Sequence, residues 1–144
     1  MSYPDDSPVR LLERLLKAVN GHDLEGLTTC FAEDYANETP AHPPRSFRGR
    51  DQVRRNWRQI FSTVPDVKAR VPRNAVDGRT LWTEWEMSGT RADGNSFLMR
   101  GVVIFGITGT VISSARFYLE PVEGTSGDVN EAVAHTVGTT PGSN

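Results

Sequence analysis

Two acidic residues, Glu84 and Glu86, stand two positions apart in a segment whose alternating pattern predicts a β-strand. Side chains two positions apart in a strand share a face and lie roughly 7 Å from each other. On a poorly solvated face, the two carboxylates would raise the pKa of at least one of them and so produce a base that works near neutral pH. The alternative is a pair of solvated glutamates at a sheet edge or a dimer surface.

Polar residues also alternate along an earlier predicted strand, Asp34–Thr39. Tyr35, Asn37 and Thr39 share one of its sides. The first two are candidates for positioning a reacting molecule, and Thr39 for contacting it. His42 follows in a proline-rich loop, where it either serves as a ligand contact and acid–base group or is an exposed loop residue.

The other histidines and the single cysteine predict neither a metal site nor a nucleophile. His22 falls in a link between two predicted helices and His135 near the C-terminus, with no spacing typical of metal ligands. Cys30 lies within about one helical turn of Leu27 and Phe31, so we expect a small core residue. We therefore expect no metal and no cofactor.

Aromatic residues supply most of the expected pocket wall. With Thr39 and His42, the expected ligand contacts are Trp57, Phe61, Trp82, Phe97 and Phe117. Which face of the predicted strand Thr80–Arg91 lines the pocket stays open at this point. One face carries Trp82, Glu84, Glu86 and Ser88, and the other carries Leu81, Thr83, Trp85 and Met87. Hydrophobicity favours the second face.

Helical spacing and capping residues predict three helices before the main strands. The first runs from Pro8 to a left-handed Gly21, the second begins at Asp23 and carries Phe31, and the third spans Gln52–Thr63.

Strand periodicity follows over four runs separated by glycine-containing turns: Val67–Val76, Thr80–Arg91, Ser96–Ile107 and Val111–Leu119. This pattern predicts a curved antiparallel meander that buries one face against the helices. Beyond Val122 the composition shifts to glycine, serine and threonine, so we expect a flexible tail over 123–144 with a weak helix at Val129–Val137.

The composition is that of one folded domain. The chain has 144 residues, 37% of them hydrophobic, and its formal charge of −2 gives no general attraction for nucleic acid or an anionic membrane. The arginines between Arg45 and Arg58 are a local exception, and their spacing favours a solvated helix face.

No apolar run reaches the roughly 20 residues of a membrane helix. The single cysteine suits a reducing compartment, so we expect a cytoplasmic protein.

Three local patterns follow one another along the chain. They are Asn20-Gly21-His22-Asp23-Leu24 with Phe31-Ala32-Glu33-Asp34, then Phe47-Arg48-Gly49-Arg50-Asp51, and finally Val111-Ile112-Ser113 with Arg116-Phe117-Tyr118-Leu119-Glu120. Together, over residues 9 to 122, they resemble the SnoaL-like branch of the nuclear transport factor 2-like superfamily.

The resemblance implies an α+β, cystatin-like fold. Three N-terminal helices wrap a curved antiparallel sheet into a cone with an apolar pocket, in a domain that spans 1–122. Ligands of this family are small molecules, and the outer sheet face commonly joins two copies. We therefore expect a small apolar or aromatic ligand and a homodimer, with neither nucleic acid nor membrane as partner.

Known reactions of the superfamily can be compared position by position. The positions that ketosteroid isomerases use hold Leu15, Thr39 and Gly101, so that mechanism lacks its base and its donors. The Tyr-x-Asn of limonene epoxide hydrolases is matched by Tyr35-Ala36-Asn37, and one of their carboxylates by Glu86. Their last-strand aspartate, which polyketide cyclases share, is replaced by Phe117.

Two functions stay open. One is an acid–base enzyme of the cyclase or isomerase type, with Glu86 and then Glu84 as the base and with Tyr35 and Asn37 as positioning residues. The other is a non-catalytic ligand-binding or dimeric assembly module of the same fold.

Overall fold

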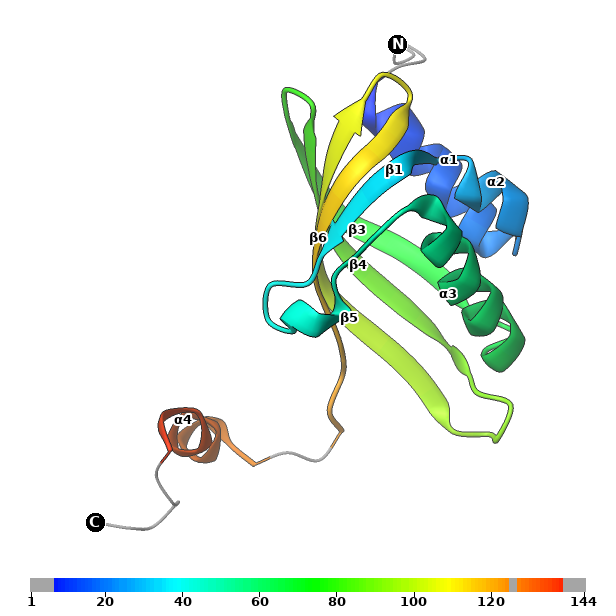
Figure 1. The fold of residues 1–144 in the computed structure, drawn as a ribbon. Coiled ribbons are helices and arrows are strands. Elements are labelled where there is room, and N and C mark those ends of the chain that lie inside the picture. Colours follow the sequence, from blue (N-terminus) through cyan, green and yellow to red (C-terminus); the bar gives the residue numbers. More distant parts are fainter. Residues whose placement is uncertain (1–6, 125–126, 139–144) are drawn as a thin grey trace.

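The computed structural model describes residues 7–124 and 127–138. Its elements are α1 (Pro8–Asn20), α2 (Leu24–Thr28), β1 (Phe31–Glu38), the 3₁₀ turn η1 (Pro43–Arg45), β2 (Phe47–Arg48), α3 (Arg50–Thr63), β3 (Lys68–Asp77), β4 (Thr80–Thr90), β5 (Ser96–Thr108), β6 (Val111–Pro121) and α4 (Val129–Val137). Figure 1 shows α1, α2 and α3 on one side of the sheet.

The C-terminal segment contains the helix that the sequence predicted. Asp128 caps α4 by accepting a hydrogen bond from Glu131 N (3.0 Å), and none of the residues of this helix is buried. The predicted flexibility of 123–144 stays a prediction, and 125–126 and 139–144 lie outside the described residues.

Helix α1 begins as the sequence predicted and ends differently. Ser7 Oγ accepts a hydrogen bond from Arg10 N (3.2 Å), and Pro8 occupies the first turn. Gly21 has a φ of −87°, so the expected left-handed conformation is wrong. The left-handed residue is His22, with a φ of 53°, because the chain reverses one residue later than glycine preference suggests.

The junction after α1 connects the helices to the edge strand β3. Asn20 Nδ2 donates to Ala69 O (2.9 Å), and Asn20 Oδ1 accepts from Ala69 N (2.7 Å). His22 Nε2 lies 2.9 Å from Val67 O, and its ring stacks on Phe61 of α3 with the centroids 4.9 Å apart. These two residues hold α1 and α3 against the same edge of the sheet.

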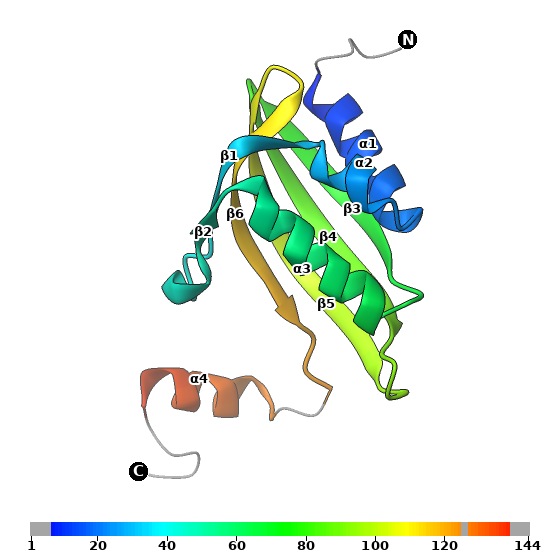
Figure 2. The same ribbon diagram turned by 45° about the vertical axis from the view of Figure 1, so that its right-hand side comes forward.

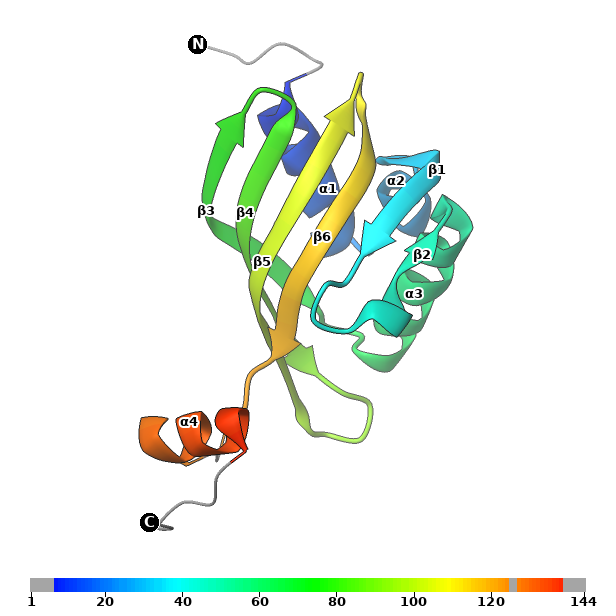
Figure 3. The ribbon, with the colours of Figure 1, turned by 60° about the vertical axis from the view of Figure 1, so that its left-hand side comes forward.

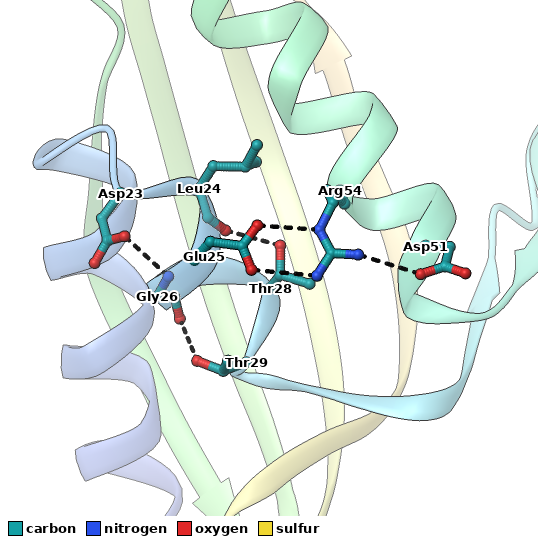
Figure 4. Close-up of polar contacts among 8 residues, drawn as sticks. All are labelled: Asp23, Leu24, Glu25, Gly26, Thr28, Thr29, Asp51 and Arg54. Atoms are coloured by element: carbon teal, nitrogen blue, oxygen red, sulfur yellow. Dashed lines mark hydrogen bonds and ion pairs between the residues drawn. The ribbon is translucent and has the colours of Figure 1, made fainter.

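Helix α2 is shorter than expected, since Phe31 already belongs to β1. Asp23 caps it as the sequence predicted. Arg54 of α3 donates from Nε to Glu25 Oε1 (3.2 Å) and from Nη1 to Asp51 Oδ1 (3.3 Å), as Figure 4 shows. Arg54 therefore connects α3 to α2 across their surface.

The sheet has six strands in the order β2-β1-β6-β5-β4-β3, and it curves around α1 and α3 (Figure 2). Strands β3 to β6 form the expected antiparallel meander, whereas β1 joins β6 in parallel orientation. The register of β3 shifts between Arg70 and Arg73, where Pro72 has no N–H to donate. The predicted α+β fold with a curved sheet is confirmed.

Strand β4 turns alternate side chains to opposite faces of the sheet. Its fully buried residues are Leu81, Thr83, Trp85 and Met87. Trp85 Nε1 donates to Thr83 Oγ1 (2.6 Å), and Thr83 Oγ1 donates to Val103 O (2.6 Å). A buried indole N–H needs an acceptor, so this hydrogen-bond chain fixes Trp85 on the inner face.

We expect Thr83→Val to lower the free energy of unfolding by about 1–3 kcal/mol, because the indole N–H of Trp85 loses its buried acceptor. Thr83→Ser keeps the hydroxyl and loses one methyl group, which costs about 1 kcal/mol. Urea unfolding followed by circular dichroism measures both values. A valine variant at least as stable as the serine variant would contradict the role of this hydrogen bond.

Candidate functional site

A cavity of about 340 Å³ opens between α3, β1 and the inner face of the sheet. Its apolar lining consists of Phe31, Phe47, Val53, Trp57, Ile60, Met87, Phe97, Met99, Phe117 and Leu119. A narrow apolar space of about 40 Å³ shares part of this lining and continues toward Trp85 and Phe105. The volume lies at the lower end of the range of about 300–1,000 Å³ that small-molecule sites occupy.

The polar part of the lining consists of Tyr35, Asn37, Thr39, Arg45 and Asn56. Tyr35 OH donates to Asn37 Oδ1 (2.8 Å), and Asn37 Nδ2 donates to Thr39 Oγ1 (3.4 Å). Burial raises the pKa of Tyr35, so its phenol stays neutral and keeps its proton. We call this hydrogen-bonded row of Tyr35, Asn37 and Thr39 the polar ladder.

The structure brings six of the site residues predicted from the sequence into this lining: Tyr35, Asn37, Thr39, Trp57, Phe97 and Phe117. Their roles in binding or catalysis stay predictions. Phe61 lies outside the lining, with its ring centroid 5.6 Å from that of Trp57 and 4.9 Å from that of His22. It therefore packs against Trp57 from outside the cavity.

The expected placement of Glu84, Glu86 and Trp82 in the pocket is wrong. The alternation along β4 turns all three to the outer face of the sheet, as hydrophobicity favoured. Glu86 pairs with Arg70 and accepts a hydrogen bond from Arg100 Nε (3.1 Å). The hydrogen bond from Arg70, helped by Arg100, holds the pKa of Glu86 below its usual value. Glu86 is therefore an ionised partner of arginines outside the pocket.

His42 also lies outside the cavity lining. Its Nε2 is 2.8 Å from Glu120 Oε1, which connects the loop between β1 and β2 to the end of β6. Its backbone O accepts a hydrogen bond from Arg45 N (2.9 Å). His42 thus helps to shape the loop that brings Arg45 to the cavity.

Several lining residues were missed by sequence reasoning, and some of them had a usable signal. Met99 and Leu119 stand two positions from Phe97 and Phe117, so strand alternation places each pair on one face. Arg45 had no such signal, because its loop has no periodicity and is held by contacts to Thr39 and to Glu120 of β6.

Cys30 is buried, as expected for a core cysteine, and burial raises the pKa of its thiol. Within residues 7–124 and 127–138, no three side chains of histidine, cysteine, aspartate or glutamate gather so that they could hold a metal ion. None of the helices in the described part of the chain combines the length and the apolar character that a membrane crossing requires.

Solved structures share this fold at low sequence identity. A protein of ketosteroid isomerase-like fold from Catenulispora acidiphila, in complex with trimethylamine, is 18% identical, with a TM-score of 0.66 over 78% of this chain and 86% of that one. An epoxide hydrolase of M. tuberculosis is 18% identical, with a TM-score of 0.67 over 78% and 81%. TsrD from Streptomyces laurentii is 24% identical, with a TM-score of 0.67 over 83% and 91%.

Comparison with protein families gives a direct assignment. No curated protein matches the chain. The SnoaL-like domain matches residues 12–114, which is more than half of the chain and includes β1, α3 and β3 to β5. The chain therefore belongs to the SnoaL-like domain family.

Proposed function

We propose that this SnoaL-like protein binds a small apolar or aromatic molecule in the cavity between α3, β1 and the sheet. The apolar lining would desolvate the body of such a ligand, and the polar ladder would orient it. We also place the protein in the cytoplasm, since its single cysteine suits a reducing compartment; cell fractionation tests this location.

One observation favours binding without catalysis: the described cavity lining contains no carboxylate, imidazole or thiol. Tyrosine is a further acid–base group of enzymes, but Tyr35 in this lining donates its hydrogen bond to Asn37, and burial raises its pKa. Glu84 and Glu86 cannot supply a carboxylate from the opposite face of the sheet. A ligand-binding module is therefore the first candidate.

An enzyme of the cyclase or isomerase type is the second candidate, and the polar ladder is the observation in its favour. The second N–H of the Asn37 amide could polarise a carbonyl oxygen of a bound substrate, while Tyr35 holds that amide in place through its hydrogen bond to Asn37 Oδ1. Such an enzyme would work by positioning and polarising its substrate.

The outer face of the sheet supports a second proposal, that two copies of the chain pair through it. Trp82, Val102 and Tyr118 lie on neighbouring strands of this face and are exposed by 47%, 36% and 40%. Figure 3 shows that the helices α1, α2 and α3 lie behind the sheet and leave the face uncovered. Contiguous exposed apolar residues mark interaction surfaces, and the ion pair of Arg73 and Glu84 beside them offers both signs of charge to a symmetric partner.

Trp57→Ala should weaken the binding of an apolar ligand at least about tenfold, because the indole forms part of the cavity wall. Trp82→Ala removes the same side chain from the outer face and should leave affinity unchanged. Isothermal titration calorimetry with polyaromatic, steroid and terpenoid ligands compares the two variants. Equal effects of both would contradict the cavity as the binding site. Mass spectrometry of the incubated ligand then separates binding from turnover.

Val102→Lys should convert the proposed dimer to a monomer, because a charge at the centre of the apolar patch must be desolvated on pairing. Thr90 is exposed at the end of β4, away from this patch, so Thr90→Lys should leave the dimer intact. Light scattering after size exclusion measures the mass against the 15.9 kDa of one chain. A wild-type monomer at tens of micromolar would refute the pairing.

A further inference from the structure

We propose that the cavity selects an amphipathic anion: a molecule with an apolar or aromatic body and a carboxylate that pairs with Arg45. This inference rests on the proposed binding function and adds the charge and class of the ligand. It follows from the one charged residue of the lining and from the direction of the hydrogen bonds around it.

Arg45 is the only charged residue among the described residues that line the cavity. Its backbone is held in the turn η1, since Arg45 N donates to His42 O (2.9 Å) and Ser46 N donates to Pro43 O (3.0 Å). Ser46 Oγ accepts from Thr39 N (3.0 Å), which fastens the turn to the end of β1. The turn therefore fixes the backbone of Arg45 at the rim of the cavity, and its exposed side chain forms part of the lining.

The guanidinium has no carboxylate partner within the described ranges, unlike several arginines elsewhere on the surface. Arg50 pairs with Glu33 (3.8 Å) and Arg116 with Glu38 (3.4 Å). Arg45 takes part in no such pair, so its charge is available to a bound molecule. A guanidinium presents paired N–H groups whose geometry matches a carboxylate.

The neutral polar groups of the lining offer donors. Asn37 Nδ2 donates to Thr39 Oγ1 (3.4 Å), so the Thr39 oxygen already accepts and its hydroxyl hydrogen is left to donate. Asn56 Oδ1 accepts from Gln52 Nε2 (2.8 Å), which leaves the Asn56 amide N–H groups free. The second N–H of Asn37 is a further donor. Donors beside one cation complement an anionic oxygen.

The apolar walls of the cavity determine the chemical character of the rest of the ligand. Beyond the polar groups, the walls are apolar as far as the narrow space near Trp85 and Phe105. An ion without an apolar body would leave this surface unfilled, and a neutral apolar molecule would leave Arg45 paired with water alone. A molecule with both parts satisfies the whole site.

The test compares 2-naphthoic acid with 2-naphthamide and 2-naphthylmethylamine, which share the aromatic body and differ in charge. Calorimetry at low salt should show that the wild type binds the acid at least about tenfold more tightly than the amide, as a charge-assisted hydrogen bond implies. Arg45→Gln should abolish this preference by weakening the binding of the acid at least about tenfold more than that of the amide. Arg48→Gln removes the same charge from an exposed arginine outside the lining and should keep the preference.

The outcomes separate this inference from the binding function on which it rests. If the amide or the amine binds as tightly as the acid, the cavity binds apolar molecules and the selection for an anion is refuted. If none of the three binds at millimolar concentration, both proposals fail. If 2-naphthyl phosphate binds more tightly than the acid, the assignment of a carboxylate is wrong. Thermal unfolding of each variant confirms that it is folded.

Discussion

The hydrogen-bond chain from Trp85 through Thr83 to the carbonyl of Val103 decides which face of β4 is buried. A strand can turn either set of alternate side chains inward, but only one set of β4 satisfies every buried polar group. The indole of Trp85 finds its acceptor in Thr83 on the same face, and no described buried side-chain polar atom lacks a partner. Met87 lies on the same face of β4 and lines the cavity. Because Val103 pairs with both Thr83 and Phe117, Phe117 of β6 also faces the cavity.

The same alternation separates the charges of the sheet from its cavity. Glu84 and Glu86 lie outside, where arginines on β3 and β5 neutralise them. The hydrogen bonds from Arg70 and Arg100 hold the pKa of Glu86 below its usual value, which is the opposite of the desolvation that would raise a pKa to the neutral range. The inner face keeps aromatic side chains and neutral donors. The fold therefore separates a cavity lined mainly by apolar side chains from an outer face that carries the ion pairs.

The cavity also depends on two connections outside the sheet. Asn20 and His22 hold α1 and α3 to β3, and the ring of His22 supports Phe61 and through it Trp57. On the opposite side, the loop after β1 is fastened by the contact between His42 and Glu120, and it positions Arg45. His22 and His42 act through packing or hydrogen bonds with neighbouring elements, and neither lies in the cavity lining.

The sequence by itself determined the order of the longer helices and strands, though not the short β2, because capping residues such as Ser7, glycine turns and hydrophobic periodicity act over a few neighbouring residues. It also located the polar ladder, since Tyr35 and its neighbours alternate along one strand. Only the tertiary structure decided the direction of Glu86 and the place of Arg45. Both depend on residues far apart in the sequence: Glu86 on its cross-strand arginines and on the burial of the opposite face, and Arg45 on a loop that folds against β1 and β6.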